Sequence, residues 1–320
     1  MKNRNEPESD VMVHTHHVFR AHQPLLDDAV RNRAFFSALR KRLGSDSALL
    51  DVGSGTGVWA IAAAKIGAKR VVAIEKDELL AGLIRTLARE NQVQDRVEVI
   101  VGDSREVSLK GRFDVIVSET IGNLAFDEQI VPILIDARKR FLKRNGALIP
   151  GSIALMAAAA HLKGRSKQAP AGIPITCGYF DSLNRNIPVM LEDKSRLTIL
   201  SDRIEITRVD LTRIKTPPKP ENLTANWKLN DATGVNCFAV WAEATLTDGV
   251  DLSTLDTTSW SPIIYRITPF EQQRGTIRFS LNLSERNNYW SASISNKESE
   301  ETQGYSPVFA YAALNANRGA

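Results

Sequence analysis

The alternation of helical and strand-like segments between residues 25 and 150 constrains the fold of this chain more than any other feature. Four apolar runs have the length and composition of buried strands: ALLDVG, RVVAIE, RVEVIVGD and FDVIVSE. Helical patterns lie between or after them: WAIAAAKIGA, ELLAGLIRTLAREN and QIVPILIDARKRFLKR. Such alternation specifies a mostly parallel sheet with helices on both faces. We therefore expect an α/β domain over residues 25–150.

The N-terminal part gives two further expectations. Residues 1–24 are expected to form an arm, because the chain begins with a polar stretch of mixed charge, MKNRNEPESD. An amphipathic helix is predicted over residues 25–43, where apolar residues recur near the helical period: Leu26, Val30, Phe35, Leu39 and Leu43.

The pattern changes after Pro150. Residues 151–320 contain short β-rich runs, among them RIEITRVDLTRI, NCFAVWAEATLT and TIRFSLNLS, separated by Asn, Asp, Gly and Pro. This spacing is typical of an antiparallel sandwich or barrel. The total of 320 residues suits two domains, so the second is expected over residues 151–320.

Composition narrows the class of protein. No apolar stretch is long enough to cross a bilayer and no export signal is visible, so we expect a cytoplasmic protein without a membrane partner. Only Cys177 and Cys237 are present, which does not make a disulfide framework. The net charge of +4 comes without a long Lys/Arg tract. The densest basic cluster, residues 137–146, is better interpreted as a cationic helix end than as a nucleic-acid patch.

Three histidines near the N-terminus, His14, His16 and His17, raise the question of a metal site. No cysteine or acid cluster accompanies them, so we expect a polar segment and no metal.

A glycine loop, LLDVGSGTGVWA, follows the first predicted strand. It places Gly53, Gly55 and Gly57 at the head of a helix, where glycines let a ligand approach the backbone closely. Glu75 ends the next strand, at the position where a carboxylate accepts hydrogen bonds from ribose hydroxyls. The third glycine of a dinucleotide fingerprint is replaced by Val58, so the loop favours a nucleoside ligand without a pyrophosphate.

Three acidic residues follow the fourth predicted strand, in SETIGNLAFDEQ. Glu119 comes at the end of the strand, and Asp127 and Glu128 come after a loop. The carboxyl end of such a strand faces the ligand crevice of an α/β sheet. Two close carboxylates repel each other, and a guanidinium ion, which is planar and permanently charged, would resolve the repulsion. If the two carboxylates contact the guanidinium unequally, the positive charge concentrates on one side and electron density becomes available on the nitrogen that attacks.

The glycine loop, Glu75 and the VGDS segment together resemble class I S-adenosylmethionine (SAM) methyltransferases. More specifically, the chain resembles the protein arginine methyltransferase family. That family carries a loop of form S-E-x-M-G-Y-x-x-x-x-E, matched here by Ser118, Glu119, Gly122 and Glu128, with Ile121 and Asn123 at the methionine and tyrosine positions. The family's H-x-x-M-L-x-D-x-x-R helix is matched by His22, Leu25, Leu26, Asp28 and Arg31.

The resemblance implies a SAM-binding Rossmann-like domain followed by a β-barrel, with a dimerisation arm over about residues 160–187 and a homodimer as the assembly. It implies that Glu119 and Glu128 are catalytic and hold a guanidinium nitrogen, and that Asp28 and Trp260 bind the substrate. The implied cofactor ligands are His22, Arg31, Asp51, Gly53, Gly55, Gly57, Glu75, Asp103 and Ser104.

The sequence departs from the family at three places. Ser259 stands where the T-H-W loop has a histidine that pairs with the aspartate at position 28; the aromatic pair that precedes the His22 helix is missing; and Arg105 stands where the family often has glutamate. The expected activity is SAM-dependent methyl transfer to arginine in a protein or peptide. Two alternatives stay open: a small guanidino or amine metabolite as the acceptor, and a non-catalytic scaffold that binds SAM.

Overall fold

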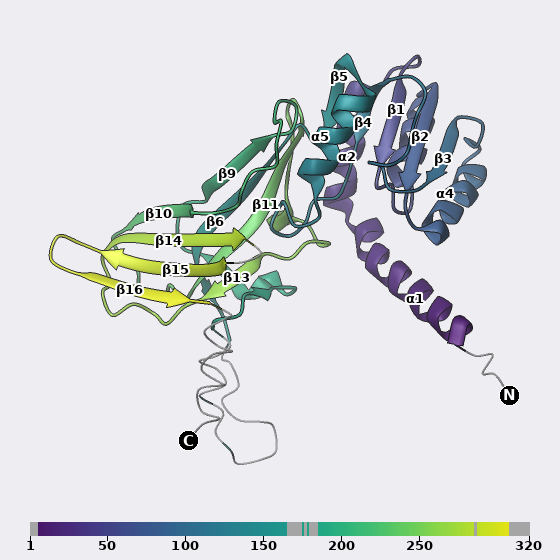
Figure 1. Ribbon diagram of the computed structural model, residues 1–320. Helices are drawn as coiled ribbons and strands as arrows, with labels where there is room; N and C mark the ends of the chain where they lie inside the picture. Colours follow the sequence, from purple (N-terminus) through teal and green to yellow (C-terminus); the bar gives the residue numbers. More distant parts are fainter. Residues whose placement is uncertain (1–5, 165–174, 176–177, 179–184, 285–286, 307–320) are drawn as a thin grey trace. The chain divides into compact units, whose positions relative to one another are not determined.

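A computed structural model describes residues 6–164, 175, 178, 185–284 and 287–306 of the chain (Figure 1). The chain divides into two compact units. The first comprises Met1–Ile153, Val209–Pro217 and Glu243–Trp260; the second comprises Ala154–Arg208, Pro218–Ala242 and Ser261–Ala320. The first unit contains every residue of the candidate site.

The centre of the first unit is a five-stranded parallel sheet. Its strands are β1 (Ala48–Val52), β2 (Arg70–Glu75), β3 (Val97–Val101), β4 (Phe113–Val117) and β5 (Leu142–Ile149). They are ordered β3-β2-β1-β4-β5, and each neighbouring pair is parallel. Because the order reverses beside β1, the loops after β1 and β4 diverge there and leave a ligand crevice. The parallel sheet predicted from the alternating pattern is confirmed.

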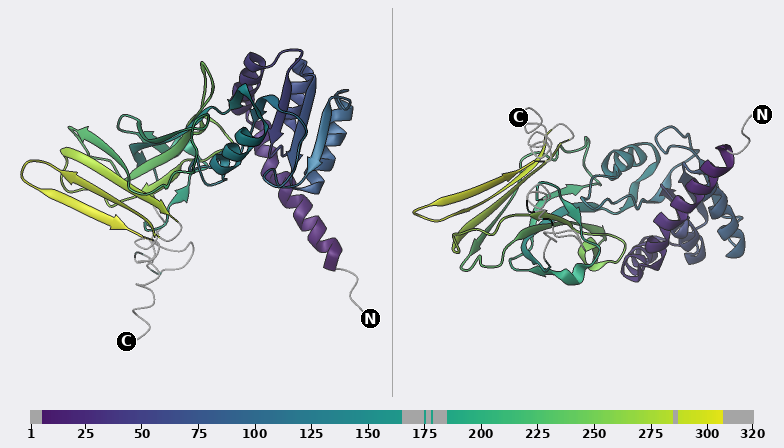
Figure 2. Two further views of the ribbon diagram at one scale, coloured as in Figure 1. Left: turned by 45° about the horizontal axis from the view of Figure 1, so that its top comes forward. Right: turned by 90° about the horizontal axis from the view of Figure 1, so that it is seen from below.

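The described part of this unit has five α-helices (Figures 1 and 2): α1 (Glu6–Asp27), α2 (Ala29–Arg42), α3 (Val58–Ile66), α4 (Glu78–Glu90) and α5 (Ile130–Phe141). α3 packs against α2, α4, β1 and β2, while α5 packs against β4 and β5. The apolar residues of β1, β2 and β4 are almost completely buried between these helices, which explains why those strands are continuously apolar in the sequence.

The prediction of a single helix over residues 25–43 is wrong, because two helices meet there. The chain is helical on both sides of Asp28, but Asp28 itself has an extended backbone with φ −77° and ψ 92°. Its side chain accepts hydrogen bonds from the backbone N–H groups of Val30 and Arg31 and so caps a new helix. Residues 6–24, expected as an arm, lie in helix α1.

The described strands of the second unit pair in an antiparallel manner. Two long strands, β6 (Ser152–Leu162) and β11 (Cys237–Thr247), each contain a boundary between the two units in the sequence. One sheet has the order β10-β14-β15-β16 and the other the order β7-β13-β11-β6-β8, with β9 beside β6 and with β12, which belongs to the first unit, beside β11. The remaining bounds are β7 Val189–Met190, β8 Leu197–Ile199, β9 Ile204–Asp210, β10 Leu223–Leu229, β12 Val250–Ser253, β13 Ile263–Arg266, β14 Gly275–Ser284, β15 Asn287–Ser295 and β16 Glu300–Tyr305.

Aromatic side chains form the core of the second unit. Phe238 stacks on Phe279 with ring centroids 4.6 Å apart, and Trp290 stacks on Tyr305 at 5.5 Å. The antiparallel pairing of the described strands in two sheets confirms the predicted architecture. The predicted dimerisation arm falls largely outside the described residues.

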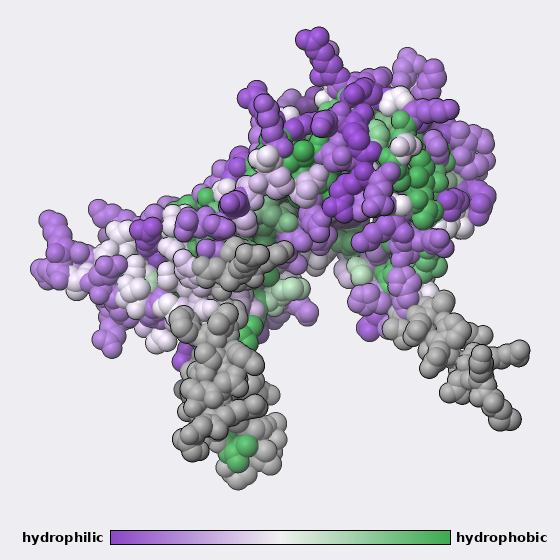
Figure 3. Space-filling view, viewed as in Figure 1, coloured by the Kyte–Doolittle hydropathy of each residue, from purple (hydrophilic) through white to green (hydrophobic). Residues whose placement is uncertain are grey.

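Polar side chains cover most of the face shown in Figure 3, with hydrophobic atoms confined to smaller areas. In the part of the chain that the structure describes, no helix is long and apolar enough to cross a membrane.

Candidate active site

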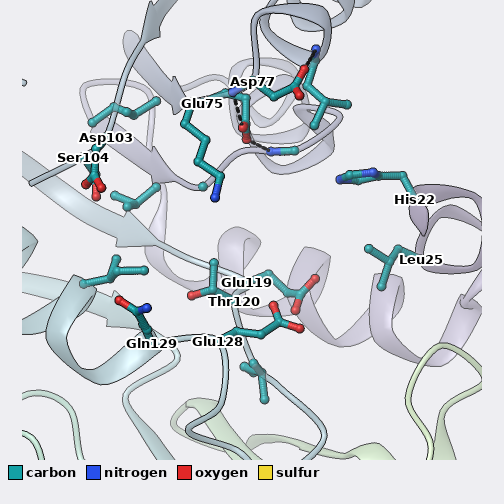
Figure 4. A pocket seen from close by; sticks show the side chains of 18 of the residues that line it. His22, Leu25, Glu75, Asp77, Asp103, Ser104, Glu119, Thr120, Glu128 and Gln129 are labelled. Carbon is teal, nitrogen blue, oxygen red and sulfur yellow. Dashed lines mark hydrogen bonds between the residues drawn. The ribbon is translucent and has the colours of Figure 1, made fainter. Parts of the chain in front are cut away.

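A cavity of about 620 Å³ opens at the carboxyl edge of the parallel sheet (Figure 4). Four strands deliver residues to it at or just after their last positions, and helix α1 adds Val18, His22 and Leu25. The other lining residues include Gly53, Gly55, Glu75, Lys76, Asp77, Asp103, Ser104, Arg105, Glu119, Thr120, Ile121, Asp127, Glu128, Gln129 and Trp260.

The glycine loop forms one wall of this cavity. Gly55 has φ +55°, and a Cβ placed on it would lie 3.2 Å from His22 Nε2, so a side chain here would be strained and would press on α1. Gly57, at φ +80°, packs behind the wall instead, because an added Cβ would lie 2.8 Å from Ile84. Two glycines thus serve different purposes: Gly55 leaves room for a ligand, and Gly57 lets α3 approach α4.

Glu75 lies on the opposite side of the cavity from Glu119 in Figure 4 and is almost fully buried. Its Oε2 accepts from Gly55 N at 2.7 Å and its Oε1 from Asp77 N at 2.9 Å. Two backbone donors therefore fix the carboxylate, and each oxygen retains a lone pair that can accept from a hydroxyl of a ligand. This arrangement suits the two hydroxyl groups of a ribose.

Asp103 and Ser104 lie at another end of the cavity, beyond β3 (Figure 4). Arg105 binds both oxygens of Asp103, with Nε to Oδ1 at 3.0 Å and Nη2 to Oδ2 at 2.6 Å. These bonds hold the pKa of Asp103 at about 2. Arg105 Nη1 also donates to Gln129 Oε1 at 3.3 Å, which links this end of the cavity to the residue after Glu128.

Glu119 forms a buried ion pair with Arg31. Arg31 Nε donates to Glu119 Oε2 at 3.0 Å, and Nη2 donates to the same oxygen. The guanidinium also lies over the ring of Trp59, 5.0 Å from its centroid. Burial raises the pKa of Glu119, while Arg31 opposes that shift. Arg31 does not line the cavity itself; it contacts the acid that does.

Glu128 lies beside Glu119 in Figure 4 and lines the cavity, where it is partly accessible to solvent. Partial burial, followed by the negative charges of Glu119 and Asp127, raises the pKa of Glu128 to about 7. No basic side chain is paired with it among the described residues. The two glutamates therefore differ: one is balanced by an arginine, and the other is available to an incoming cation.

Asp28 is completely buried and does not reach the cavity. Its Oδ2 accepts three hydrogen bonds, from Thr258 N at 2.9 Å, Ser259 N at 2.9 Å and Ser259 Oγ at 2.7 Å. Burial acts to raise the pKa of Asp28, but the hydrogen bonds from Arg31 N, Ser259 and Thr258 together lower it. Asp28 and Ser259 thus form a structural link in place of an aspartate–histidine pair.

Trp260 follows this link directly and lines the cavity. Its Nε1 donates to Ile121 O at 2.7 Å, so the indole is fixed to the loop that carries Glu119.

Nine of the predicted site residues line this cavity. They are Trp260, His22, Gly53, Gly55, Glu75, Asp103, Ser104, Glu119 and Glu128. Asp28, Arg31, Asp51 and Gly57 lie behind the lining. Asp51 supports the glycine loop, because its Oδ2 accepts from Ala60 N at 3.1 Å at the start of α3, and burial raises its pKa to about 7.

Sequence reasoning missed several lining residues, notably Lys76, Asp77 and Gln129. Asp77 had a visible signal, since an aspartate one residue before a helical pattern is typical of an N-cap. It caps α4 through Leu79 N and Leu80 N, and its Oδ2 contacts His14 Nε2 at 2.7 Å. His14 therefore binds an acid of the cavity wall from helix α1.

Comparison with known proteins agrees with this geometry. The family model described as ribosomal protein L11 methyltransferase (PrmA) matches residues 34–161. An arginine N(omega)-methyltransferase of Streptomyces achromogenes subsp. streptozoticus is 31% identical over 252 residues, which are 73% of this chain and 66% of that protein. The protein arginine N-methyltransferase PRMT10 of Arabidopsis thaliana is 38% identical over 135 residues, which are 41% of this chain and 35% of that protein.

Two solved structures share the fold. The Trypanosoma brucei PRMT1 enzyme–prozyme heterotetrameric complex with AdoHcy has a TM-score of 0.74 at 20% identity, covering 89% of this chain and 96% of that chain. Arabidopsis thaliana protein arginine methyltransferase 10, in an open conformation, has a TM-score of 0.73 with the same coverage. The sequence matches span about two thirds of the Streptomyces protein and about a third of the plant relative. The chain belongs to the arginine N-methyltransferase family of SAM-dependent methyltransferases.

Proposed function

We propose that the protein is a SAM-dependent N-methyltransferase that transfers a methyl group to a guanidinium nitrogen held by Glu119 and Glu128. The observation that carries the proposal is that both glutamates line the same cavity as the glycine loop and Glu75. The methyltransferase family model, the named arginine methyltransferases and the AdoHcy in the Trypanosoma complex support the same reaction class.

The residues of the cavity fit the cofactor. Gly53 and Gly55 leave space that a Cβ would fill, and the anchored carboxylate of Glu75 suits a ribose. Asp103 and Ser104 would lie beside the adenine, and His22 at the cofactor's edge. When bound, SAM supplies an electrophilic methyl group on a sulfonium. Arg31 is also a predicted ligand of the cofactor's carboxylate, and its hydrogen bond to Glu119 supports a second role in orienting the first glutamate.

The two glutamates would bind and polarise the acceptor. A guanidinium offers five donors in a fixed fork, so carboxylates on two sides can hold its plane and direct one nitrogen toward the donor. The attacking nitrogen would gain the methyl group and lose a proton, and the C–S bond of the donor would break to leave S-adenosylhomocysteine. Glu128, with a pKa of about 7 and no basic partner among the described residues, is suited to accept that proton near neutral pH.

Transfer of tritiated methyl from SAM to an arginine-rich peptide, to free arginine and to guanidino compounds tests the proposal. Glu128→Gln keeps the shape of the side chain and removes its charge, so turnover should fall while S-adenosylhomocysteine affinity stays nearly unchanged. If SAM binds in calorimetry but no guanidino acceptor is methylated, the protein is a non-catalytic scaffold.

A second candidate function is methylation of free arginine or another small guanidino compound. The Streptomyces relative, whose match covers 73% of this chain, is named an arginine N(omega)-methyltransferase, whereas the Arabidopsis relative is named a protein arginine N-methyltransferase. Label that appears only in the metabolites would exclude the protein substrate.

The homodimer is also a proposal. It rests on the resemblance to a family with a dimerisation arm, and light scattering of the purified protein would test it.

A further inference from the structure

Asp127 is a third carboxylate on the loop that carries Glu119 and Glu128. It precedes Glu128 on the loop between β4 and α5 and lines the cavity with it. Its Oδ1 accepts from Leu124 N at 3.1 Å, which fixes the carboxyl against the loop. A Cβ on Gly122 would lie 1.8 Å from that oxygen, so a glycine at position 122 is required for this position of Asp127. The side chain is therefore held in place and is still partly accessible to solvent.

The charges of the cavity are strongly unequal, although the chain as a whole carries +4. Six acids line it (Glu75, Asp77, Asp103, Glu119, Asp127 and Glu128), against two permanent cations, Lys76 and Arg105. Arg105 is bound to Asp103, and Lys76 also acts on Asp103, so both cations serve the cofactor end. From behind the lining, Arg31 balances Glu119.

Asp127 and Glu128 are left without a basic partner among the described residues. Burial raises the pKa of both, and the charge of Asp127 contributes to the shift of Glu128. A guanidinium carries one positive charge, so it can balance Glu128 but leaves Asp127 uncompensated beside it. An acceptor with a second positive group balances both carboxylates.

We propose that Asp127 is a specificity residue that binds an ammonium group of the acceptor, so that the substrate is a small molecule carrying both a guanidinium and an ammonium. This inference rests on the proposed function. An arginine inside a peptide has no such ammonium, because its α-nitrogen is an uncharged amide. Free arginine has both cations and a carboxylate, and agmatine has both cations and no carboxylate. The matched compound 5-guanidinopentanoate, which is arginine without its amine, has the carboxylate and only one cation, the guanidinium.

The test compares kcat/KM for these acceptors in the full-length protein. The wild type should favour arginine over 5-guanidinopentanoate by ~10-fold or more, as expected for the loss of one charge-assisted hydrogen bond. Asp127→Asn should reduce this ratio to within about 3-fold, mainly by weakening arginine, and Asp127→Glu should retain most of the preference. An arginine peptide should behave like the compound without the amine.

Two controls separate specificity from a damaged loop. S-adenosylhomocysteine affinity, measured by calorimetry, should be the same in all variants, and Asp46→Asn should leave the ratio unchanged because exposed Asp46 lies outside the cavity lining. If Asp127→Asn lowers both kcat/KM values equally, or if the wild type prefers the peptide, the inference is wrong. If the wild type methylates no guanidino acceptor at all, the proposed function itself fails.

Discussion

At the scale of single residues, the difference between Glu119 and Glu128 governs the chemistry. Arg31 keeps Glu119 balanced whether or not an acceptor is present, whereas Glu128 changes its charge near neutral pH. A carboxylate that is protonated in the empty site and ionised in the complex couples binding of a cation to release of a proton. The activity of the protein should therefore report the titration of Glu128.

We expect kcat/KM for the guanidino acceptor to rise with pH through about 7, because the free protein must ionise Glu128 to bind the cation. Glu128→Gln should lower kcat/KM by ~10²–10³-fold, the range for loss of one electrostatic contact to a transition state, and should abolish this rise. A wild-type rate that does not change between pH 5.5 and 8.5 would contradict the role given to Glu128.

The same group affects stability in the absence of ligands. Its pKa is higher in the folded protein than in the unfolded chain, so the folded state binds the proton more tightly and loses stability as pH rises from about 4.5 to about 7. Glu128→Gln removes this loss. Melting temperatures should therefore fall less between pH 5 and 8 in the variant than in the wild type, and equal slopes would refute the shift. Asp51, unchanged in both proteins, cancels in this comparison.

At the scale of elements, one aspartate joins two segments far apart in sequence. Asp28 ends the α1 region, caps α2, and holds the loop of Thr258 and Ser259 that leads to Trp260. Trp260 in turn is bonded to Ile121, next to the glutamate loop. The site thus depends on a junction that has no contact with the cavity.

Asp28→Ala should destabilise the protein by about 2–4 kcal/mol, because it removes a helix cap and leaves two backbone N–H groups without their acceptor. Ser259→Ala is the matched control: it removes only the hydroxyl contact and should cost about 1 kcal/mol. Urea unfolding gives both values. Equal losses in the two variants would show that the backbone bonds to Asp28 contribute little.

At the scale of the whole molecule, ligand binding should stabilise the unit that holds the cavity. S-adenosylhomocysteine at 100 times its Kd should add ~2.7 kcal/mol to the unfolding free energy of that unit. Glu75→Ala should bind more weakly and lose most of this gain at the same ligand concentration, because the anchored carboxylate is gone. Differential scanning calorimetry checks this. A ligand-induced shift that is as large in Glu75→Ala as in the wild type would remove Glu75 from the cofactor site.

The sequence by itself determined the class of the first unit, the glycine loop and the acidic positions. These features depend on residues that are close in the sequence. A strand buried on both faces must be apolar, and an amphipathic helix must repeat its apolar residues about every 3.6 positions. Glu75 and Glu119 were predictable because Glu75 ends β2 and Glu119 comes just after β4, at the same edge of the sheet. Glu128 was predictable only on the assumption that the loop after β4 returns to that edge before α5.

Only the tertiary structure decided which polar groups compensate each other. The pairing of Arg31 with Glu119 joins positions 88 residues apart, and that of Asp28 with Ser259 joins positions 231 apart. No local pattern encodes such contacts, because they depend on how distant segments pack. The same pairings leave Asp127 and Glu128 without basic partners in the described part of the chain. This excess of negative charge depends on which side chains the fold places around one cavity.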